Sequence, residues 1–382
     1  MIRGASALAL AASLSVSCFA SSPPETSAIP SGAQRVTVTA DTAGQLQAVL
    51  TAQAAALARG DAEGYRATYD ATRPAFRRCK QETFESAVRQ RGAPRPMKVL
   101  RAEEYGDAYV RAWVDGGESS GVSRIYFRKI DGAWVQSEPT ETEVGAEKHT
   151  TVDGIDIDYW AIDDDVVGAL ARGTIAARDA VVEHQLAPST HPFGIRFYPT
   201  RSVTTLVGCT LVGYHLTNQP NDKYIRFFRY WFTPDLTALS PVTISFIQHE
   251  GLHWVQDQFS PGITARLDWW LTEGWPDYVG ASRSSEYKRA VVCGTPTPTF
   301  KQLVDGPPDL PDTPPEEPVR YYAFANTMVE FLYARFGPDA YRQLLEAYKS
   351  GVDPSVNYPL VLKVSPGAFY ADWLAFAKKS YC

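Results

Sequence analysis

The chain has 382 residues, of which 45% are hydrophobic and 21% charged, and its formal net charge is −6 at pH 7. This length leaves room for two domains and a sizeable core, and the composition is that of an ordinary globular protein. The sequence contains no basic stripe or basic tail, so it gives no indication of nucleic-acid binding.

The first twenty residues have the pattern of a bacterial-type signal peptide. Arg3 places one positive charge before an apolar stretch from Ala5 to Val16, which is too short to span a bilayer. The small residue Ala20 provides a suitable cleavage site. We therefore expect residues 1–20 to be removed from an exported protein, whether secreted, periplasmic or at the cell surface, that has no transmembrane span.

An alternative for this leader is lipid attachment at Cys18. That reading requires a leucine-like side chain three residues earlier, where the sequence has Ser15. Cleavage is therefore the preferred interpretation, and lipid anchoring stays open. The Ser/Pro-rich residues 21–35 that follow are expected to form a flexible linker.

Four cysteines remain after the leader: Cys79, Cys209, Cys293 and Cys382. In an oxidising compartment they predict two disulfides, and sequence alone leaves three possible pairings. The alternative is a set of buried free thiols. A metal-binding role is disfavoured because no two of them form a close pair.

Residues 36–147 are expected to form an α+β domain. Helical periodicity runs from Thr42 to Arg78, and Gly60-Asp61 is expected to divide it into two helices. Asp131-Gly132 is a hairpin turn signal. Strand-like alternation is found in four segments, at residues 97–100, 108–114, 123–127 and 133–136.

The pattern "ALARGDAEGYRATYD" followed by "VSRIYFRKIDGAWVQSE" resembles the nuclear-transport-factor-2-like (SnoaL-like) family. The resemblance implies helices packed against a curved sheet in the shape of a cone, and it carries no catalytic residues. Cones of this kind can hold a small ligand. A structural or substrate-presenting accessory role is the favoured interpretation.

A second domain is expected from residue 155 to residue 382. Asp163-Asp164-Asp165 precedes a helical run from Val166 to Leu186, so the acidic cluster is expected to cap that helix, with calcium binding as the alternative. Three strands are expected to follow, at residues 193–198, 205–214 and 224–232.

The strongest functional signal is the sequence Gln248-His249-Glu250-Gly251-Leu252-His253. Ser240-Pro241 reads as a helix N-cap followed by proline at the first helical position. Two histidines four apart on that helix share one face, so both imidazoles can bind one metal ion. Glu250 would lie beside the metal, where it can accept a proton from water.

A third metal ligand is expected from a second helix at Trp270-Leu271-Thr272-Glu273-Gly274. A catalytic zinc takes three protein ligands and keeps one open position, and the Glu273 carboxylate would complete such a set with His249 and His253. The competing interpretation is a helix with two hydrogen-bonded histidines and no metal.

Together, His249-Glu250-x-x-His253 and the Glu273 segment resemble the gluzincin metallopeptidases, and most closely the peptidase MA-like proteins of the thermolysin and aminopeptidase N clan. The resemblance implies that His249, His253 and Glu273 bind Zn²⁺ and that Glu250 is the general base. It also implies a thermolysin-like domain with a small sheet, the motif-bearing helix and a helical C-terminal half. The strand at 224–232 would then border a substrate cleft, unless its aromatic residues belong to the core.

The same resemblance gives roles to two further residues. Asp277 stands four residues after Glu273, where related enzymes keep an aspartate that hydrogen-bonds a ligand histidine. The alternative is a solvated helix residue. Pro276 departs from the family pattern, and because it lacks an N–H we expect the ligand helix to begin late or to kink.

The region from Cys293 to Arg320 is rich in proline and is expected to be a loop that shapes the cleft entrance. A helical region follows to the C-terminus. Tyr322 near its start resembles the aminopeptidase tyrosine that stabilises the oxyanion. One alternative is that Tyr321 occupies this position instead. The other is that the tyrosine only packs in the core.

The fold expected is therefore α+β in two domains, and the function expected is that of an exported zinc metallopeptidase acting on a peptide or protein substrate. The Gly-x-Met-Glu-Asn segment of aminopeptidases does not occur in the sequence, which favours an endopeptidase. Two alternatives stay open: a catalytically weak zinc-containing binding module, and a zinc hydrolase of a non-peptide amide or ester.

Overall fold

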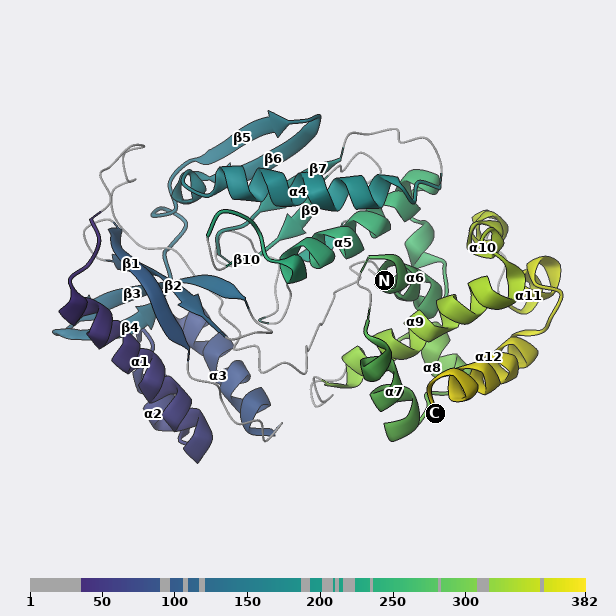
Figure 1. Ribbon diagram of the computed structural model, residues 1–382, viewed down its shortest axis with the longest axis horizontal. Helices are drawn as coiled ribbons and strands as arrows, with labels where there is room; N and C mark the ends of the chain where they lie inside the picture. Colours follow the sequence, from purple (N-terminus) through teal and green to yellow (C-terminus); the bar gives the residue numbers. More distant parts are fainter. Residues whose placement is uncertain are drawn as a thin grey trace.

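The structure is a computed structural model that describes residues 36–89, 97–105, 109–116, 121–186, 193–200, 209, 213–215, 224–233, 236–280, 283–307, 316–350 and 354–382. The expected signal peptide, Cys18, the linker at 21–35 and most of the strand expected at 205–214 lie outside these residues. The described chain contains both helices and sheets, which confirms the α+β class (Figure 1). Within it, no helix has the length and apolarity needed to cross a membrane.

The described part of the chain begins with three helices rather than the two expected. They are α1 (Ala40–Arg59), α2 (Ala62–Ala67) and α3 (Pro74–Arg89). Gly60 ends α1 in the left-handed conformation at φ 65°, which explains the predicted break. The second break, after Thr68, has no glycine or proline signal until Pro74, and for this reason sequence periodicity missed it.

The first sheet packs against these helices. Its strands β1 (Lys98–Tyr105), β2 (Tyr109–Asp115), β3 (Val122–Ile130) and β4 (Ala133–Ser137) are antiparallel neighbours in chain order. The β3–β4 hairpin turns at Asp131 and Gly132, both at positive φ, as the Asp-Gly signal predicts. Leu46 and Leu50 of α1 share a buried cluster with Ile125 of β3.

The second sheet has the order β5-β6-β7-β9-β8. Its strands are β5 (Glu147–Val152), β6 (Ile155–Trp160), β7 (Gly194–Phe197), β8 (Gly213–His215) and β9 (Tyr224–Phe227). The β5–β6 hairpin turns at Asp153-Gly154, so this sheet begins at Glu147 rather than near Ile155. Helix α4 (Val167–Val182) follows β6 and lies alongside the sheet (Figure 1).

Asp163, Asp164 and Asp165 do not cap α4. The N-cap residue is Val166, and no side chain caps this helix end. Asp163 and Asp165 instead form ion pairs with arginines of the first sheet, while Asp164 pairs with Lys148 of β5. The capping prediction was wrong because the partners of these carboxylates come from strands distant in sequence.

The strand expected at 224–232 is divided between the two sheets. Its first part is β9, and its last part is β10 (Trp231–Phe232), which pairs with Ser123 and Val122 of β3. One short segment therefore leaves the second sheet and adds a strand to the first. Continuous backbone joins the sheets immediately before the helix that carries the histidines.

The described residues after β10 are mainly helical (Figure 1). It contains α5 (Pro241–Phe259), α6 (Trp269–Val279), α7 (Ser285–Gly294), α8 (Phe300–Asp305), α9 (Glu316–Phe336), α10 (Ala340–Lys349), α11 (Pro354–Val361) and α12 (Pro366–Tyr381). Helix α8 lies within the region expected to be a loop, and a capping box between Thr299 and Gln302 starts it.

Glycines allow close contact between the helices that carry the candidate site. A Cβ built at Gly251 of α5 would lie 2.8 Å from a methyl group of Val181 in α4. A Cβ built at Gly274 of α6 would lie 2.7 Å from the carbonyl oxygen of Ala325 in α9. Both distances are too short for a side chain, so α5 and α6 are held at their positions by backbone approach.

The four described cysteines form two disulfides, Cys79–Cys209 and Cys293–Cys382. This confirms the prediction of two bridges and selects one of the three pairings. Cys79 lies on α3 and Cys209 belongs to the later half of the chain, so the first bridge joins segments 130 residues apart. The second ties α7 to the C-terminus. Two such bridges are compatible with an exported protein.

Candidate metal centre

Helix α5 begins where the sequence predicts. The side chain of Ser240 accepts a hydrogen bond from the Thr243 backbone N–H at 3.2 Å, and Pro241 occupies the first helical position. His249 and His253 then lie one turn apart on the same face, with ring centroids 5.0 Å apart.

Glu273 of α6 meets both histidines. Its Oε2 atom lies 3.3 Å from Nε2 of His249 and 3.3 Å from Nε2 of His253. The three candidate ligand atoms lie within 4.8 Å of one another, and all three residues are 1% exposed. The structure therefore brings together the three residues that the sequence singled out as ligands.

The hydrogen bonds of Gln256 define the tautomer of His253. Gln256 Nε2 donates to the carbonyl oxygen of Thr272 at 3.0 Å and approaches the Tyr341 hydroxyl at 2.6 Å, which directs its Oε1 to the other side. That Oε1 lies 2.8 Å from Nδ1 of His253 and, as a pure acceptor, requires Nδ1 to carry the proton. In the neutral ring, Nε2 therefore presents its lone pair to Glu273.

This arrangement fits a cation. A lone pair of His253 and a carboxylate oxygen of Glu273 repel each other unless a positive charge lies between them, and within the described chain Nε2 of His253 has no hydrogen bond of good geometry. Two imidazole nitrogens and one carboxylate oxygen form the donor set of a catalytic zinc site. The residues present thus fit the metal that the resemblance implies.

The pKa values show the same preference for positive charge. Burial opposes ionisation of Glu273, yet the charge of the nearby His253 and the hydrogen bond with His249 hold its pKa well below the usual range. Burial also disfavours charge on His253, but Glu273 raises the pKa of that histidine to about 9. His249 has a lowered pKa, chiefly because of burial. In the metal-free protein the raised pKa keeps His253 protonated at neutral pH, and its positive charge lies beside Glu273, where a cation would sit.

Pro276 affects this geometry in a way that differs from the expectation. Helix α6 begins at Trp269, before Glu273, so it does not start late. The proline lies inside the helix and cannot donate to the Thr272 carbonyl. Gln256 donates to that carbonyl instead. Pro276 therefore leaves the Thr272 carbonyl free to accept from the Gln256 amide, whose oxygen orients His253.

Glu250 and Tyr322 complete the centre. Glu250 is 1% exposed, and its charge is close enough to raise the pKa values of both His253 and Tyr322. The hydroxyl of Tyr322 donates to Oε2 of Glu273 at 3.2 Å. Burial raises the pKa of Tyr322 well above its ordinary value, so the phenol keeps its proton at neutral pH. The ring of Tyr321, the alternative in register, packs against Trp269.

Asp277 has different partners from those expected. Its two carboxylate oxygens accept from Arg283 at 2.6 Å each, and Asn326 donates to Oδ2 at 3.0 Å. Its effect on His249 is electrostatic, since it raises the pKa of that ring, and the direct hydrogen bond to a ligand histidine is not what the structure shows.

Sequence patterns did not single out Gln256, Arg283 and Asn326. Two of them have a spacing signal. Gln256 stands three residues after His253 and Asn326 four residues after Tyr322, so each lies one helical turn from a site residue. Arg283 lies before the start of α7 and six residues after Asp277, a separation that gives no helical spacing signal.

The aromatic residues between β9 and β10 belong to the core, which was the alternative to a place beside a substrate cleft. Phe228 stacks on Tyr198 with ring centroids 5.1 Å apart, and Tyr230 donates to Asp163 at 2.6 Å. Both side chains are buried where the two sheets meet, so they do not form the wall of a substrate cleft.

Comparison of the chain with protein-family models and with curated proteins finds no match. The centre is therefore interpreted from its own residues. It combines two buried imidazoles, one buried carboxylate ligand, a second carboxylate beside them and a protonated phenol, and every one of these side chains is at most 2% exposed.

Proposed function

We propose that the protein is an exported zinc-dependent metallopeptidase. The observation that supports the proposal is the convergence of His249, His253 and Glu273 on one point, with Glu250 beside them. A purely structural zinc site has no need for a second carboxylate next to its ligands and usually closes all four positions with protein atoms. In this centre three protein atoms are available as metal ligands.

In this proposal His249, His253 and Glu273 hold Zn²⁺. When bound, zinc supplies Lewis acidity that activates water and polarises the scissile carbonyl. Glu250 accepts the proton of the attacking water and later delivers it to the leaving amine. Tyr322, whose phenol stays protonated, donates to the oxygen on which negative charge develops.

The class of substrate is proposed from the absence of one sequence segment. The aminopeptidase segment Gly-x-Met-Glu-Asn, which holds a substrate amine, is absent from the sequence. We therefore favour cleavage within a peptide chain. We further propose that residues 36–147 form an accessory domain of the nuclear-transport-factor-2-like type ahead of a gluzincin-like domain at 155–382, with β10 as the strand that links them.

One observation favours a second candidate, a zinc-holding module that cleaves nothing efficiently. The side chains of His249, Glu250, His253, Glu273 and Tyr322 are at most 2% exposed, so a substrate reaches them only if neighbouring parts of the chain move. A buried metal could contribute stability alone. The two candidates share the metal and differ in whether Glu250 performs chemistry.

The deciding experiment compares wild type with Glu250→Gln, and with Glu286→Gln as a matched control in the exposed first turn of α7. Zinc content is measured by elemental analysis, and turnover with a peptide library and a panel of small amides and esters. The peptidase proposal expects about one zinc per chain in all three proteins. It expects turnover in wild type and control and a loss of most turnover in Glu250→Gln.

Each other outcome is informative. Zinc without turnover on any substrate would favour the zinc-holding module, and turnover on esters alone would indicate a non-peptide hydrolase. Full turnover in Glu250→Gln would contradict the assigned base. A protein that binds no zinc after careful repletion would refute the metal centre itself.

A further inference from the structure

A small cavity lies where the two sheets meet, away from the metal centre. It has a volume of about 30 Å³, and the described residues that line it are Ser123, Arg124, Tyr126, Pro199, Phe228, Arg229, Tyr230 and Trp231. A space of this size accommodates about two water molecules or one small ion. Its walls come from β3 of the first sheet, from the segment between β9 and β10 with the first residue of β10, and from Pro199 after β7.

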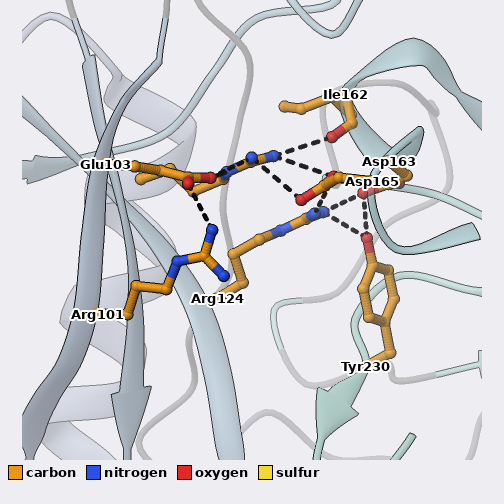
Figure 2. Close-up of polar contacts among 8 residues, drawn as sticks. Arg101, Glu103, Arg124, Ile162, Asp163, Asp165 and Tyr230 are labelled. Carbon is orange, nitrogen blue, oxygen red and sulfur yellow. Dashed lines mark hydrogen bonds and ion pairs between the residues drawn. The ribbon is translucent and has the colours of Figure 1, made fainter. Parts of the chain in front are cut away.

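A buried network of arginines and carboxylates adjoins this cavity through Arg124 and Tyr230, and Figure 2 shows its polar contacts. Arg124 reaches from β3 to Asp163, which also accepts from Tyr230. Arg111 of β2 lies beside it and pairs with Glu103 and Asp165. The charged groups of Arg111, Arg124, Glu103, Asp163 and Asp165 are at most 5% exposed, so their electrostatic interactions are weakly screened.

Several donors at the cavity lack an acceptor. Within the described part of the chain, no hydrogen bond is made by the Tyr126 hydroxyl, by Nη1 of Arg124, or by Nε and Nη1 of Arg229. Nη1 of Arg124 has only a longer ion pair, at 3.7 Å from Asp165. Tyr126 is 2% exposed, so water outside the protein does not satisfy its hydroxyl. Buried donors without partners are costly, which predicts an occupant that accepts.

The fully buried charges at the junction are the guanidiniums of Arg111 and Arg124 and the carboxylates of Glu103, Asp163 and Asp165. The more exposed guanidiniums of Arg101 and Arg229 turn this balance into one excess positive charge. Among the described residues, Arg229 has no carboxylate partner and contacts only the ring of Trp231, at 5.4 Å. Because the whole chain carries a net charge of −6, this positive potential is local to the junction.

We propose that this cavity binds one small monovalent anion, of the size of chloride or formate, between Arg124, Tyr126 and Arg229. The guanidinium groups can only donate hydrogen bonds, and the Tyr126 hydroxyl can rotate to donate as well. Positively charged donors of this kind exclude a metal cation. A neutral water would satisfy part of the donors but would leave the guanidinium of Arg229, which is only partly exposed, without an anionic partner. Oδ2 of Asp163 also lacks a hydrogen bond, but Asp163 does not line the cavity.

The anion would link the two sheets at a position that supports α5. Trp231, in the cavity wall, receives and donates backbone hydrogen bonds at the start of that helix: its N–H donates to Oγ1 of Thr243 at 2.9 Å, and its carbonyl accepts from the Ser240 N–H at 2.8 Å. An anion that binds the folded junction and not the unfolded chain raises the stability of the protein by mass action.

The test is thermal unfolding of the full chain in sodium chloride, sodium formate and sodium gluconate at constant ionic strength. Gluconate serves as an anion too large for the cavity. Arg229→Gln removes the uncompensated charge, and Tyr126→Phe removes one donor while keeping the packing. Arg226→Gln on β9 is the matched control, because its guanidinium donates to the Tyr224 carbonyl and does not line the cavity.

The proposal expects a saturable rise in Tm with chloride or formate over gluconate, in wild type and Arg226→Gln alike. It expects this rise to vanish in Arg229→Gln, and the anion concentration at half-saturation to increase several-fold in Tyr126→Phe. If Arg229→Gln fails to fold, the shift in Tyr126→Phe decides alone. Equal responses to all three salts, or an unchanged half-saturation in Tyr126→Phe, would show a hydrated cavity and overturn the proposal.

Discussion

The side-chain amide of Gln256 donates a hydrogen bond to the backbone carbonyl of Thr272 across 3.0 Å. This contact joins α5 to α6 at the residue before Glu273, and it fills the acceptor that Pro276 cannot use. The same amide presents its oxygen to His253. One side chain thus couples the position of the third candidate ligand to the orientation of the second.

Gln256→Leu should lower zinc affinity by about 10–100-fold, because loss of the outer hydrogen bond frees the His253 ring. It should also destabilise the metal-free protein by ~1–3 kcal/mol, since the Thr272 carbonyl loses a donor. Gln258→Leu on the same helix is the control. Competition with a chromophoric chelator measures the affinity on protein shown to be folded by circular dichroism. Equal affinity in both variants would remove Gln256 from the site.

Tyr322→Phe should reduce kcat by about 10²–10³-fold and leave KM nearly unchanged, if the phenol donates to charge that develops only in the transition state. Tyr321→Phe alters the neighbouring tyrosine, which is equally buried, and should retain activity. Steady-state kinetics on one peptide substrate compares the two. A loss confined to KM would place Tyr322 in substrate binding, and no change would move the oxyanion role elsewhere.

Zinc binding at pH 7 should release about one proton, because His253 must give up the proton on Nε2 to become a ligand. The raised pKa of His253 determines the direction in which zinc affinity changes with pH. Glu273 holds the pKa of metal-free His253 at about 9, so protons compete with zinc below that pH, and apparent affinity falls about tenfold for each unit of decrease. Calorimetry in two buffers of different ionisation enthalpy counts the protons. A value near zero would mean that His253 is already neutral.

Asp268, the N-cap residue of α6, should make the protein less stable as the pH rises between about 4 and 6. Burial raises its pKa from 3.8 to about 6, even though Tyr358 donates to it at 2.9 Å. The native state therefore binds more protons than the unfolded state in that window, and stability is lost as those protons leave.

In Asp268→Asn this dependence disappears. The free energy of unfolding of the variant, relative to wild type, should increase by about 2 kcal/mol between pH 4 and pH 7. Urea unfolding at several pH values measures the difference, and the subtraction removes the titration of all other groups. Parallel stability curves for the two proteins would contradict a raised pKa at Asp268.

Gly274→Ala should destabilise the protein by ~1–3 kcal/mol, because the added methyl group would lie 2.7 Å from a backbone oxygen that cannot move freely. Separation of α6 from α9 would also move Glu273 away from Tyr322, so zinc affinity should fall. Gly367→Ala is the control, since a Cβ there has nothing within 4 Å. Thermal unfolding and chelator competition report the two effects, and equal behaviour of both variants would deny that this helix contact positions the site.

Local patterns account for much of what the sequence predicted. Ser240-Pro241 indicated the start of α5 because capping and proline geometry depend only on neighbouring residues. Asp131-Gly132 indicated the β3–β4 turn for the same reason. His249 and His253 share a face because helical periodicity alone places residues four apart together.

Predictions failed where a residue's partner is distant in the chain. Asp163 and Asp165 looked like helix caps, yet Arg111 and Arg124, some forty to fifty residues earlier, pair with them. Asp277 was expected beside a histidine, but it pairs with Arg283, six residues later and outside any helix, and with Asn326 of α9, which is 49 residues later. Periodicity carries no information about such partners.

The sequence by itself determined the α+β class, the helix start at Ser240 and the set of residues able to hold a metal. Only the tertiary structure decided which cysteines pair, that the segment from Tyr224 to Phe232 divides between two sheets, and that Gln256 orients His253. The physical reason is that helix and turn formation follow from interactions within a few residues, whereas pairing between elements depends on the packing of the whole chain.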